Sequence, residues 1–139
     1  MGDRLRVCHF FLAAVLLAAG IAPAPAKAED IDTWTPVVEH HKDVLIARLG
    51  ICESGTSAHP DRSGYLGPYQ FSTRTVINYV RERDGRTLTV AEAQALARDE
   101  GRAAELAKYV IFERNGYGNW PACSHKLGLA RQVALIRVP

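Results

Sequence analysis

Apolar residues recur at helical spacing through most of the chain after residue 34. Thr35-Pro36 suits a helix start, because threonine can cap the first turn and proline needs no backbone hydrogen bond there. The apolar positions that follow keep a period near 3.6 residues: Val38, Leu45, Leu49 and Cys52. We therefore predict a helix from about residue 36 to about residue 53. The segment 54–69 is rich in Gly, Ser, Pro and Asp, which predicts a loop with a short strand around Tyr65.

Two capping signals mark the next helices. Ser72 can cap a second helix, which should end by Gly85. Thr89 and Glu92 have the spacing of a capping box, and this predicts the start of a third helix.

The last third of the chain continues the helical period as far as Asn115-Gly116, a plausible helix stop. The pattern leaves open whether Gly101 divides this region into two helices. One more amphipathic helix is indicated after Cys123 by three apolar residues: Leu129, Val133 and Ile136. There is no internal repeat, no heptad run and little strand pattern, so we predict a mainly α fold.

The N-terminus has the layout of a secretory signal peptide. Two arginines precede an apolar run over residues 7–19, and Ala26-Lys27-Ala28 supplies a small-x-small cleavage pattern. We place the mature start at Glu29, with cleavage after Ala26 as the alternative. A membrane anchor needs about 20 apolar residues, and this run is shorter. The sequence thus predicts a signal peptide, 1–28, and one domain, 29–139, with no stable membrane insertion after cleavage.

Removing the signal peptide balances the charge. Of 17 basic and 15 acidic residues, residues 1–28 hold three and one, so 14 of each remain. Nucleic-acid binding usually leaves a basic patch or stripe, whereas the charges here are interspersed, as in Arg81-Glu82-Arg83-Asp84. We therefore exclude nucleic acid as a partner.

Cys52 and Cys123 are the two cysteines of the mature chain. An even pair in an exported protein favours a disulfide. Two buried free thiols are the simpler alternative. A zinc site that adds His59 and His125 would lack the paired short spacing of structural zinc sites, so we expect no metal.

Three motifs carry a family resemblance. Cys52-Glu53-Ser54-Gly55 ends the first helix, Gly67-Pro68-Tyr69-Gln70-Phe71 opens the second, and Gly116-Tyr117-Gly118-Asn119-Trp120-Pro121-Ala122-Cys123 follows later. In this order they resemble the lysozyme-like lytic transglycosylase superfamily, and most of all its resuscitation-promoting factor domain. The resemblance covers roughly residues 34–127. It departs from the family pattern in the loop before Gly67 and in the longer segment 81–99.

The resemblance implies a compact lysozyme-like domain with a short loop and strand region beside the cleft and one disulfide, which joins Cys52 to Cys123. It also implies cleavage of the β-1,4 bond between N-acetylmuramic acid and N-acetylglucosamine in peptidoglycan, with Glu53 as the catalytic residue. Members of the superfamily can work with one glutamate, since the muramoyl 6-hydroxyl attacks the anomeric carbon and gives a 1,6-anhydro product. No metal or organic cofactor is implied.

Elementary chemistry gives a separate reason to single out Glu53. A carboxylate at a helix C-terminus faces the negative end of the dipole, and nearby aromatic rings would desolvate it, so both effects favour its protonated form. Glycosidic cleavage at neutral pH needs such an acid. The alternative is a surface glutamate paired with Arg48 or Arg62. Glycosidases usually have a second carboxylate, and the nearest in sequence, Asp61, fits a turn residue better.

The remaining site candidates are expected to bind substrate. Gln70 resembles the family's glutamine beside the cleft, and its alternative role is to hold the loop backbone. Tyr65, Tyr69 and Tyr117 could stack on sugar faces. Trp120 fits the core better because it lies close to Cys123.

We therefore expect a secreted or periplasmic, cell-wall-associated monomer that acts on the glycan strands of peptidoglycan. The first alternative is a muramidase-type hydrolase of the same bond, with water as the nucleophile. The second is a non-catalytic module that binds cell-wall glycan on a lysozyme-like scaffold.

Overall fold

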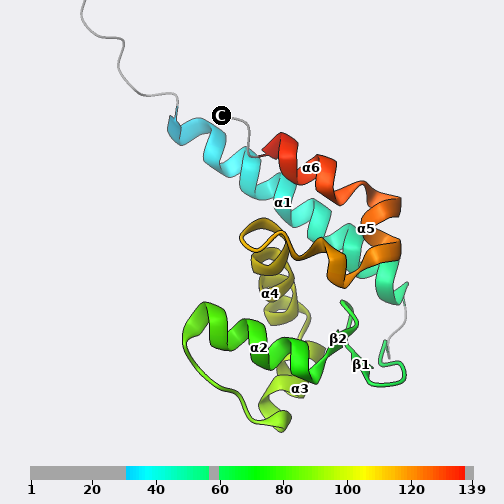
Figure 1. The fold of residues 1–139 in the computed structure, drawn as a ribbon. Helices are drawn as coiled ribbons and strands as arrows, with labels where there is room; N and C mark the ends of the chain where they lie inside the picture. Colours follow the sequence, from blue (N-terminus) through cyan, green and yellow to red (C-terminus); the bar gives the residue numbers. More distant parts are fainter. Residues whose placement is uncertain (1–30, 57–59, 137–139) are drawn as a thin grey trace, which may run out of the picture.

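The computed structural model describes residues 31–56 and 60–136, and this part of the chain is mainly helical (Figure 1). Its α-helices are α1 (Ile31–Ser54), α2 (Thr73–Asp84), α3 (Val90–Arg98), α4 (Glu100–Phe112), α5 (Pro121–Leu127) and α6 (Leu129–Ile136). A 3-10 helix, η1 (Gly116–Asn119), precedes α5. Two short antiparallel strands, β1 (Tyr65–Leu66) and β2 (Phe71–Ser72), separate α1 from α2. The predicted mainly α fold, with a short strand at Tyr65, is confirmed.

The predicted signal peptide lies outside the described residues. Within the described residues, no helix is long and apolar enough to cross a membrane. The helix α1 begins at Ile31, so the predicted start at Pro36 was five residues late. A proline this close to the helix start removes one hydrogen bond near a fraying end, which the long helix tolerates.

The predicted caps are present. The Ser72 hydroxyl accepts a hydrogen bond from the backbone N–H of Thr75 at 3.1 Å, and Gly85 ends α2 in the left-handed conformation. Thr89 and Glu92 form a complete capping box at the start of α3. These local signals therefore predicted two helix starts and one helix end correctly.

The break between α3 and α4 falls at Asp99 and not at Gly101. Asp99 ends α3 with an extended backbone, and its carboxylate accepts a hydrogen bond from the backbone N–H of Arg102 at 2.8 Å. One residue thus ends one helix and caps the next. The open question about two helices is settled in favour of two, with Gly101 inside the first turn of α4.

The helix α4 forms the centre of the core. It contacts α1 on one side and both α2 and α3 on the other, as Figure 1 shows. Its buried residues are Ala103, Leu106, Ala107, Val110, Ile111 and Phe112. Buried apolar side chains from the other α-helices and from both strands pack against them, so the described residues share one hydrophobic core.

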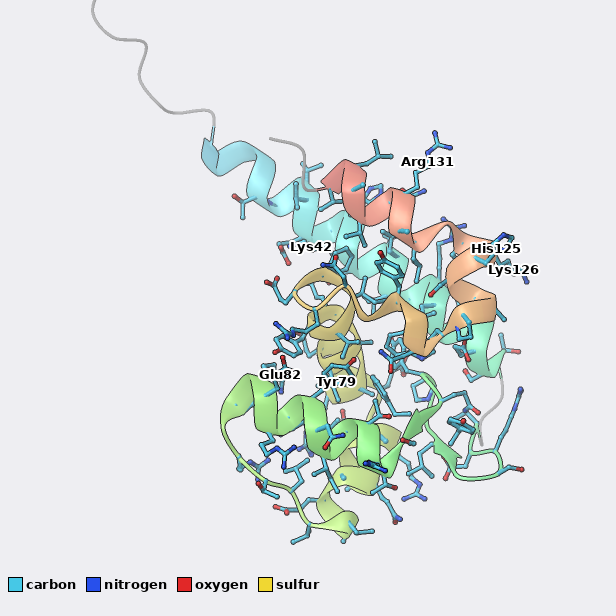
Figure 2. The ribbon with its side chains drawn as sticks, viewed as in Figure 1. Lys42, Tyr79, Glu82, His125, Lys126 and Arg131 are labelled. Carbon is cyan, nitrogen blue, oxygen red and sulfur yellow. A yellow bond between two sulfur atoms is a disulfide. The ribbon has the colours of Figure 1, made fainter. Side chains whose placement is uncertain are left out.

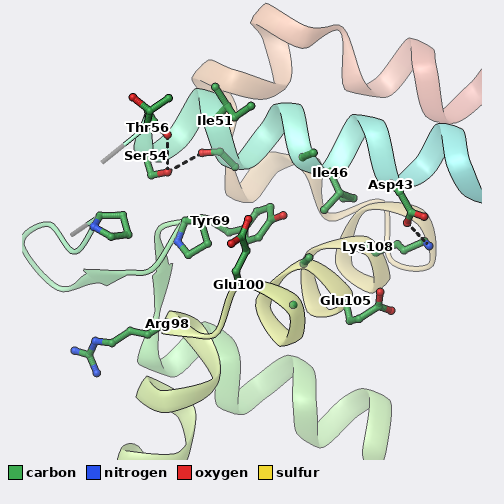
Figure 3. A pocket seen from close by; sticks show the side chains of 17 residues that line it. Asp43, Ile46, Ile51, Ser54, Thr56, Tyr69, Arg98, Glu100, Glu105 and Lys108 are labelled. Carbon is green, nitrogen blue, oxygen red and sulfur yellow. Dashed lines mark hydrogen bonds and ion pairs between the residues drawn. The ribbon is translucent and has the colours of Figure 1, made fainter. Parts of the chain in front are cut away.

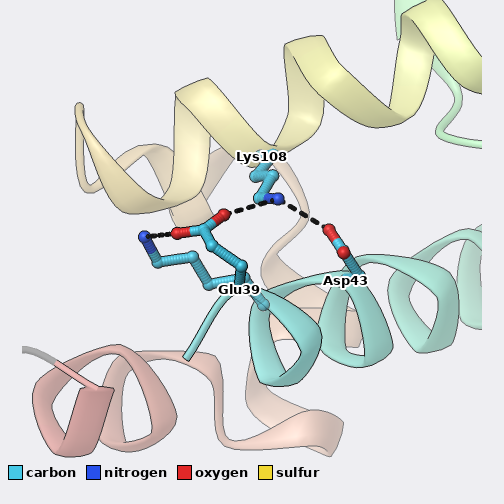
Figure 4. Close-up of polar contacts among 4 residues, drawn as sticks. Glu39, Asp43 and Lys108 are labelled. Atoms are coloured by element: carbon cyan, nitrogen blue, oxygen red, sulfur yellow. Dashed lines mark hydrogen bonds and ion pairs between the residues drawn. The ribbon is translucent and has the colours of Figure 1, made fainter. Parts of the chain in front are cut away.

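Ion pairs reinforce the contact between α1 and α4. The Lys108 ammonium lies 2.6 Å from an Asp43 oxygen and 2.8 Å from a Glu39 oxygen, and Glu39 also binds Lys42 at 2.7 Å (Figure 4). These contacts hold the pKa of Glu39 below its usual value and that of Lys108 above its own. The positive charge of Lys108 is therefore already neutralised by two carboxylates.

Polar contacts also tie α2 to the segment after α4. The Asn119 side-chain amide donates to the Tyr79 hydroxyl at 3.0 Å, and Arg114 forms an ion pair with Glu82. The outer surface of α5 and α6 carries exposed basic side chains instead: His125, Lys126 and Arg131 (Figure 2).

Candidate active site

Glu53 is the penultimate residue of α1 and is half-buried. Burial raises the pKa of its carboxyl above the usual value, and the positive charge of Arg62 opposes this more weakly. Among the residues that the structure describes, no hydrogen bond or ion pair holds the carboxyl group. The alternative of a glutamate in an ion pair with Arg48 or Arg62 is therefore wrong. A half-buried carboxyl group with no partner and a raised pKa can act as an acid.

The end of α1 is fixed from several directions. Cys52 forms a disulfide with Cys123 of α5, with the two Cα atoms 5.9 Å apart, so the predicted pairing is confirmed. The buried Ser54 hydroxyl donates back to the Gly50 carbonyl at 2.9 Å. These contacts flank Glu53 in the sequence and hold the backbone that carries it.

The disulfide also overturns the zinc alternative. Both sulfur atoms are bonded to each other, so neither is available as a thiolate ligand. His59, a third member of that proposed set, lies outside the described residues. Within the described part of the chain, no group of three or more His, Cys, Asp or Glu residues could hold a metal ion.

The loop after α1 is built around Gln70 and Asp61. Gln70 has a positive φ of 50°, and its side-chain amide donates to the Pro60 carbonyl at 2.5 Å and to the Gly67 carbonyl at 2.8 Å. The Asp61 carboxylate accepts from the backbone N–H of Gly67 at 2.8 Å and from the Arg98 guanidinium at 2.8 Å. Of the two roles considered for Gln70, its amide group serves the loop backbone. Asp61 itself lies outside the turns, and its carboxylate instead holds the start of the turn at Gly67.

The three tyrosines fall in different environments. Tyr65 in β1 is exposed, and Tyr117 in η1 is half-buried. Tyr69 is only 4% exposed, so its ring faces cannot serve as a stacking platform for a sugar, and this part of the prediction is wrong for Tyr69. Its backbone carbonyl accepts the indole N–H of Trp120 at 2.7 Å. Trp120 is 3% exposed and packs edge-on against Phe71, so its placement in the core is confirmed.

A groove of about 760 Å³ runs between α1 and α4 (Figure 3). Gly50, Ser54 and Gly55 line it from the α1 side, but Glu53 does not. The Glu53 side chain is therefore not part of the wall of this groove, although the two residues that follow it are. Sequence reasoning missed this groove because its walls come from segments about fifty residues apart, and no local motif links them.

A comparison with curated proteins finds a protein of similar sequence. Resuscitation-promoting factor Rpf of Micrococcus luteus is 30% identical over 112 residues, which cover 80% of this chain. The chain is a distant homologue of that factor. The family resemblance predicted from the three motifs is therefore confirmed. The chain spans 40% of the length of this resuscitation-promoting factor. No family model matches the chain, and no solved structure matches it significantly.

Proposed function

We propose that this homologue of resuscitation-promoting factor cleaves peptidoglycan glycan strands between N-acetylmuramic acid and N-acetylglucosamine, with Glu53 as a single catalytic acid and base. The observation that carries the proposal is the state of Glu53. Its carboxyl group is half-buried at a fixed helix end, has no partner among the described residues, and has a pKa raised by burial. Glycosidic cleavage near neutral pH needs such a group.

The glycosidic bond breaks first through an oxocarbenium-like state, and the 6-hydroxyl then attacks the same face of the anomeric carbon, with balanced proton transfers. Glu53 donates its proton to the oxygen of the leaving N-acetylglucosamine as the bond from that oxygen to the muramoyl anomeric carbon breaks. The muramoyl 6-hydroxyl oxygen forms the new bond to this carbon and gives its proton to the Glu53 carboxylate. The product is a 1,6-anhydromuramoyl end, and Glu53 is regenerated in its acid form.

One observation and one general principle favour the substrate's own hydroxyl over water as the nucleophile. The nearest second carboxylate in sequence, Asp61, is engaged by the Gly67 backbone and by Arg98 and is thus committed to the loop. An internal hydroxyl held near the anomeric carbon also has a high effective concentration. The chain therefore favours a transglycosylase over a muramidase-type hydrolase.

The same proposal includes an extracytoplasmic location. The N-terminal 28 residues have the pattern of a signal peptide, and a disulfide of the observed kind persists in oxidising compartments. We infer that the mature domain, 29–139, acts as a monomer on the cell wall after secretion or export to a periplasm.

The test compares the wild-type protein with Glu53→Gln on purified peptidoglycan. The amide is nearly isosteric but cannot donate the required proton, so cleavage should fall by at least about a hundredfold. The matched control is Glu113→Gln, which makes the same change at an exposed residue after α4 and should keep full activity. Undiminished turnover by Glu53→Gln would remove Glu53 from its role.

Mass spectrometry of the released fragments identifies the reaction. A transglycosylase leaves 1,6-anhydromuramoyl ends, each lighter by one water than a hydrolysed end, and few new reducing sugars. Hydrated reducing ends would instead identify a hydrolase. Tight binding to the cell wall without any cleavage would support the non-catalytic binding module.

A further inference from the structure

Arg62 begins a tight turn in the loop between α1 and β1. Its backbone N–H donates to the Tyr65 carbonyl at 2.8 Å, and its own carbonyl accepts from the Tyr65 N–H at 2.6 Å. The two residues between them, Ser63 and Gly64, have positive φ angles of 35° and 87°, as a two-residue hairpin turn of this twist requires. The backbone of Arg62 is therefore held by two hydrogen bonds, and its side chain leaves the turn from a fixed point.

The residues on either side of this turn are tied to other parts of the fold. Asp61, just before it, forms an ion pair with Arg98 of α3 at 2.8 Å. Leu66, just after it, is buried in the hydrophobic core. The turn that carries Arg62 therefore has a defined place in the domain.

The Arg62 side chain reaches back to the C-terminal end of α1. One guanidinium nitrogen donates to the Ser54 carbonyl oxygen at 3.5 Å, a long hydrogen bond. The carbonyl groups at a helix end lack partners within the helix and form the negative end of its dipole, so a cation there is favourable. This contact also places the positive charge of Arg62 at the residue that directly follows Glu53.

No carboxylate among the described residues cancels the charge of Arg62. Its neighbour Asp61 is engaged by Arg98, and Glu53 does not form an ion pair with Arg62. The guanidinium therefore acts on the Glu53 carboxyl group through space and not by binding it. The carboxyl group thus stays available for proton transfer.

Other ionisable groups near the end of α1 do not have this effect. The helices α4 and α5 both contact α1. Burial raises the pKa of Glu53, the positive charge of Arg62 opposes this, and no other described charge shifts it. The groups without effect on α1, the loop, α4 and α5 are Arg48, Asp61, Tyr65, Glu100, Arg102, Glu105, Lys108, His125 and Lys126. Arg62 is therefore the one described charge that favours the ionised form of Glu53.

We infer that Arg62 is a positioning residue that stabilises the ionised form of Glu53 during the reaction. This inference rests on the proposed function, in which Glu53 gives up its proton to the leaving oxygen and then acts as a base. A half-buried carboxylate is unfavourable without compensation, and a nearby cation supplies that compensation. Arg62 lies in the loop before Gly67, where the sequence departs from the family pattern, so the inference concerns this chain in particular.

The test measures the titration of the Glu53 carboxyl group by NMR in the purified protein, without substrate. R62Q removes the charge and should move the midpoint of this titration upward by at least about 0.3 pH unit. R62K keeps the charge and should stay within about 0.2 pH unit of the wild type. The matched control R131Q makes the same change at an exposed arginine of α6 and should leave the midpoint where it is.

The direction of the shift separates this role from a structural one. If Arg62 only held the end of α1 in place, its loss would let the helix fray and return the Glu53 carboxyl group to water. The midpoint would then move down toward its ordinary value. An unchanged or lowered midpoint in R62Q would overturn the inference, and so would an equal rise in R131Q or the full rise in R62K.

Salt provides a readout that needs no variant. At about 1 M NaCl the Debye length falls to about 3 Å, so the charge of the exposed guanidinium is screened. The wild-type midpoint should therefore rise toward that of R62Q, and the midpoint of R62Q should move less. A wild-type midpoint that does not rise with salt would contradict an electrostatic effect of Arg62.

Turnover of peptidoglycan should follow the titration. The alkaline limb of the pH profile of kcat/KM reports the essential acid of the free enzyme, so R62Q should move this limb upward by the same amount. A limb that stays in place would overturn the role of Arg62 in the reaction. Because the NMR titration needs no cleavage, failure of Glu53 as the acid would appear in the glycan digests, and failure of the Arg62 effect would appear in the titration.

Discussion

Replacing Cys52 and Cys123 together by alanine should lower the free energy of unfolding by about 4 kcal/mol. The disulfide joins residues 71 positions apart. Closing a loop of this length restricts the unfolded chain, and the chain-entropy relation then gives roughly 4 kcal/mol at 25 °C. In a domain of this size, 1 kcal/mol corresponds to about 5 °C in Tm, so Tm should fall by about 20 °C.

Thermal unfolding followed by circular dichroism provides the assay. The wild-type protein is measured with and without a reductant, and so is the double alanine variant. Reduced wild-type protein should unfold near the temperature of the variant, while the variant should not respond to the reductant. A variant that unfolds within about 5 °C of the oxidised wild type would refute the loop-closure reasoning. The reasoning would also be refuted if the wild-type protein kept its Tm in the reductant while mass spectrometry showed that its disulfide was reduced.

Four further predictions concern the loop, the acid and the N-terminus. Gly67→Ala should destabilise the fold by roughly 3 kcal/mol in urea titration, because its Cβ would lie 1.7 Å from the Ala97 carbonyl oxygen at a φ of +67°; near-wild-type stability would contradict this. Gln70→Ala should cost about 1–2 kcal/mol in the same titration, since two carbonyl groups lose their donor, and no measurable cost would speak against that role. Glu53→Gln should raise Tm at pH 7, because a carboxyl whose folded pKa is raised above 4.5 destabilises the fold once it is ionised. This gain in Tm should vanish at a pH below the pKa of the unfolded chain, and a gain of equal size at pH 3.5 would contradict burial as the cause. Intact mass of the exported protein should show Glu29 as the first residue, and retention of residues 1–28 would exclude cleavage.

Local signals predicted the starts of α2 and α3, where a capping side chain bonds to nearby backbone. Ser72 and Thr89 bond to amide groups three residues ahead, so the cap depends on only a few neighbouring residues. The split at Asp99 escaped prediction because an aspartate between two apolar runs also fits the exposed face of one long helix. The short helix α5 was not predicted, since seven residues around Cys123 show less than two full helical turns.

The site was predictable only in part. The position of Glu53 and its disulfide neighbour followed from short motifs, and the structure places Glu53 at a helix end as expected. The role of Gln70 and the burial of Tyr69 depend on how the loop folds back on itself, which no local pattern encodes.

The burial that raises the pKa of Glu53 also costs folding free energy when the carboxyl ionises. This cost explains why a disulfide and side-chain hydrogen bonds are placed at the end of α1. A free helix end frays easily, and a frayed end would return the carboxyl to water and restore its ordinary pKa. Here the disulfide at Cys52 ties the helix end to α5, and the Ser54 hydroxyl bonds back to Gly50. The Ser54 carbonyl oxygen in turn accepts a hydrogen bond from the Arg62 guanidinium at 3.5 Å. Because these contacts keep the last turn of α1 folded around a half-buried carboxyl, the disulfide helps to keep the pKa of Glu53 raised as well as stabilising the domain.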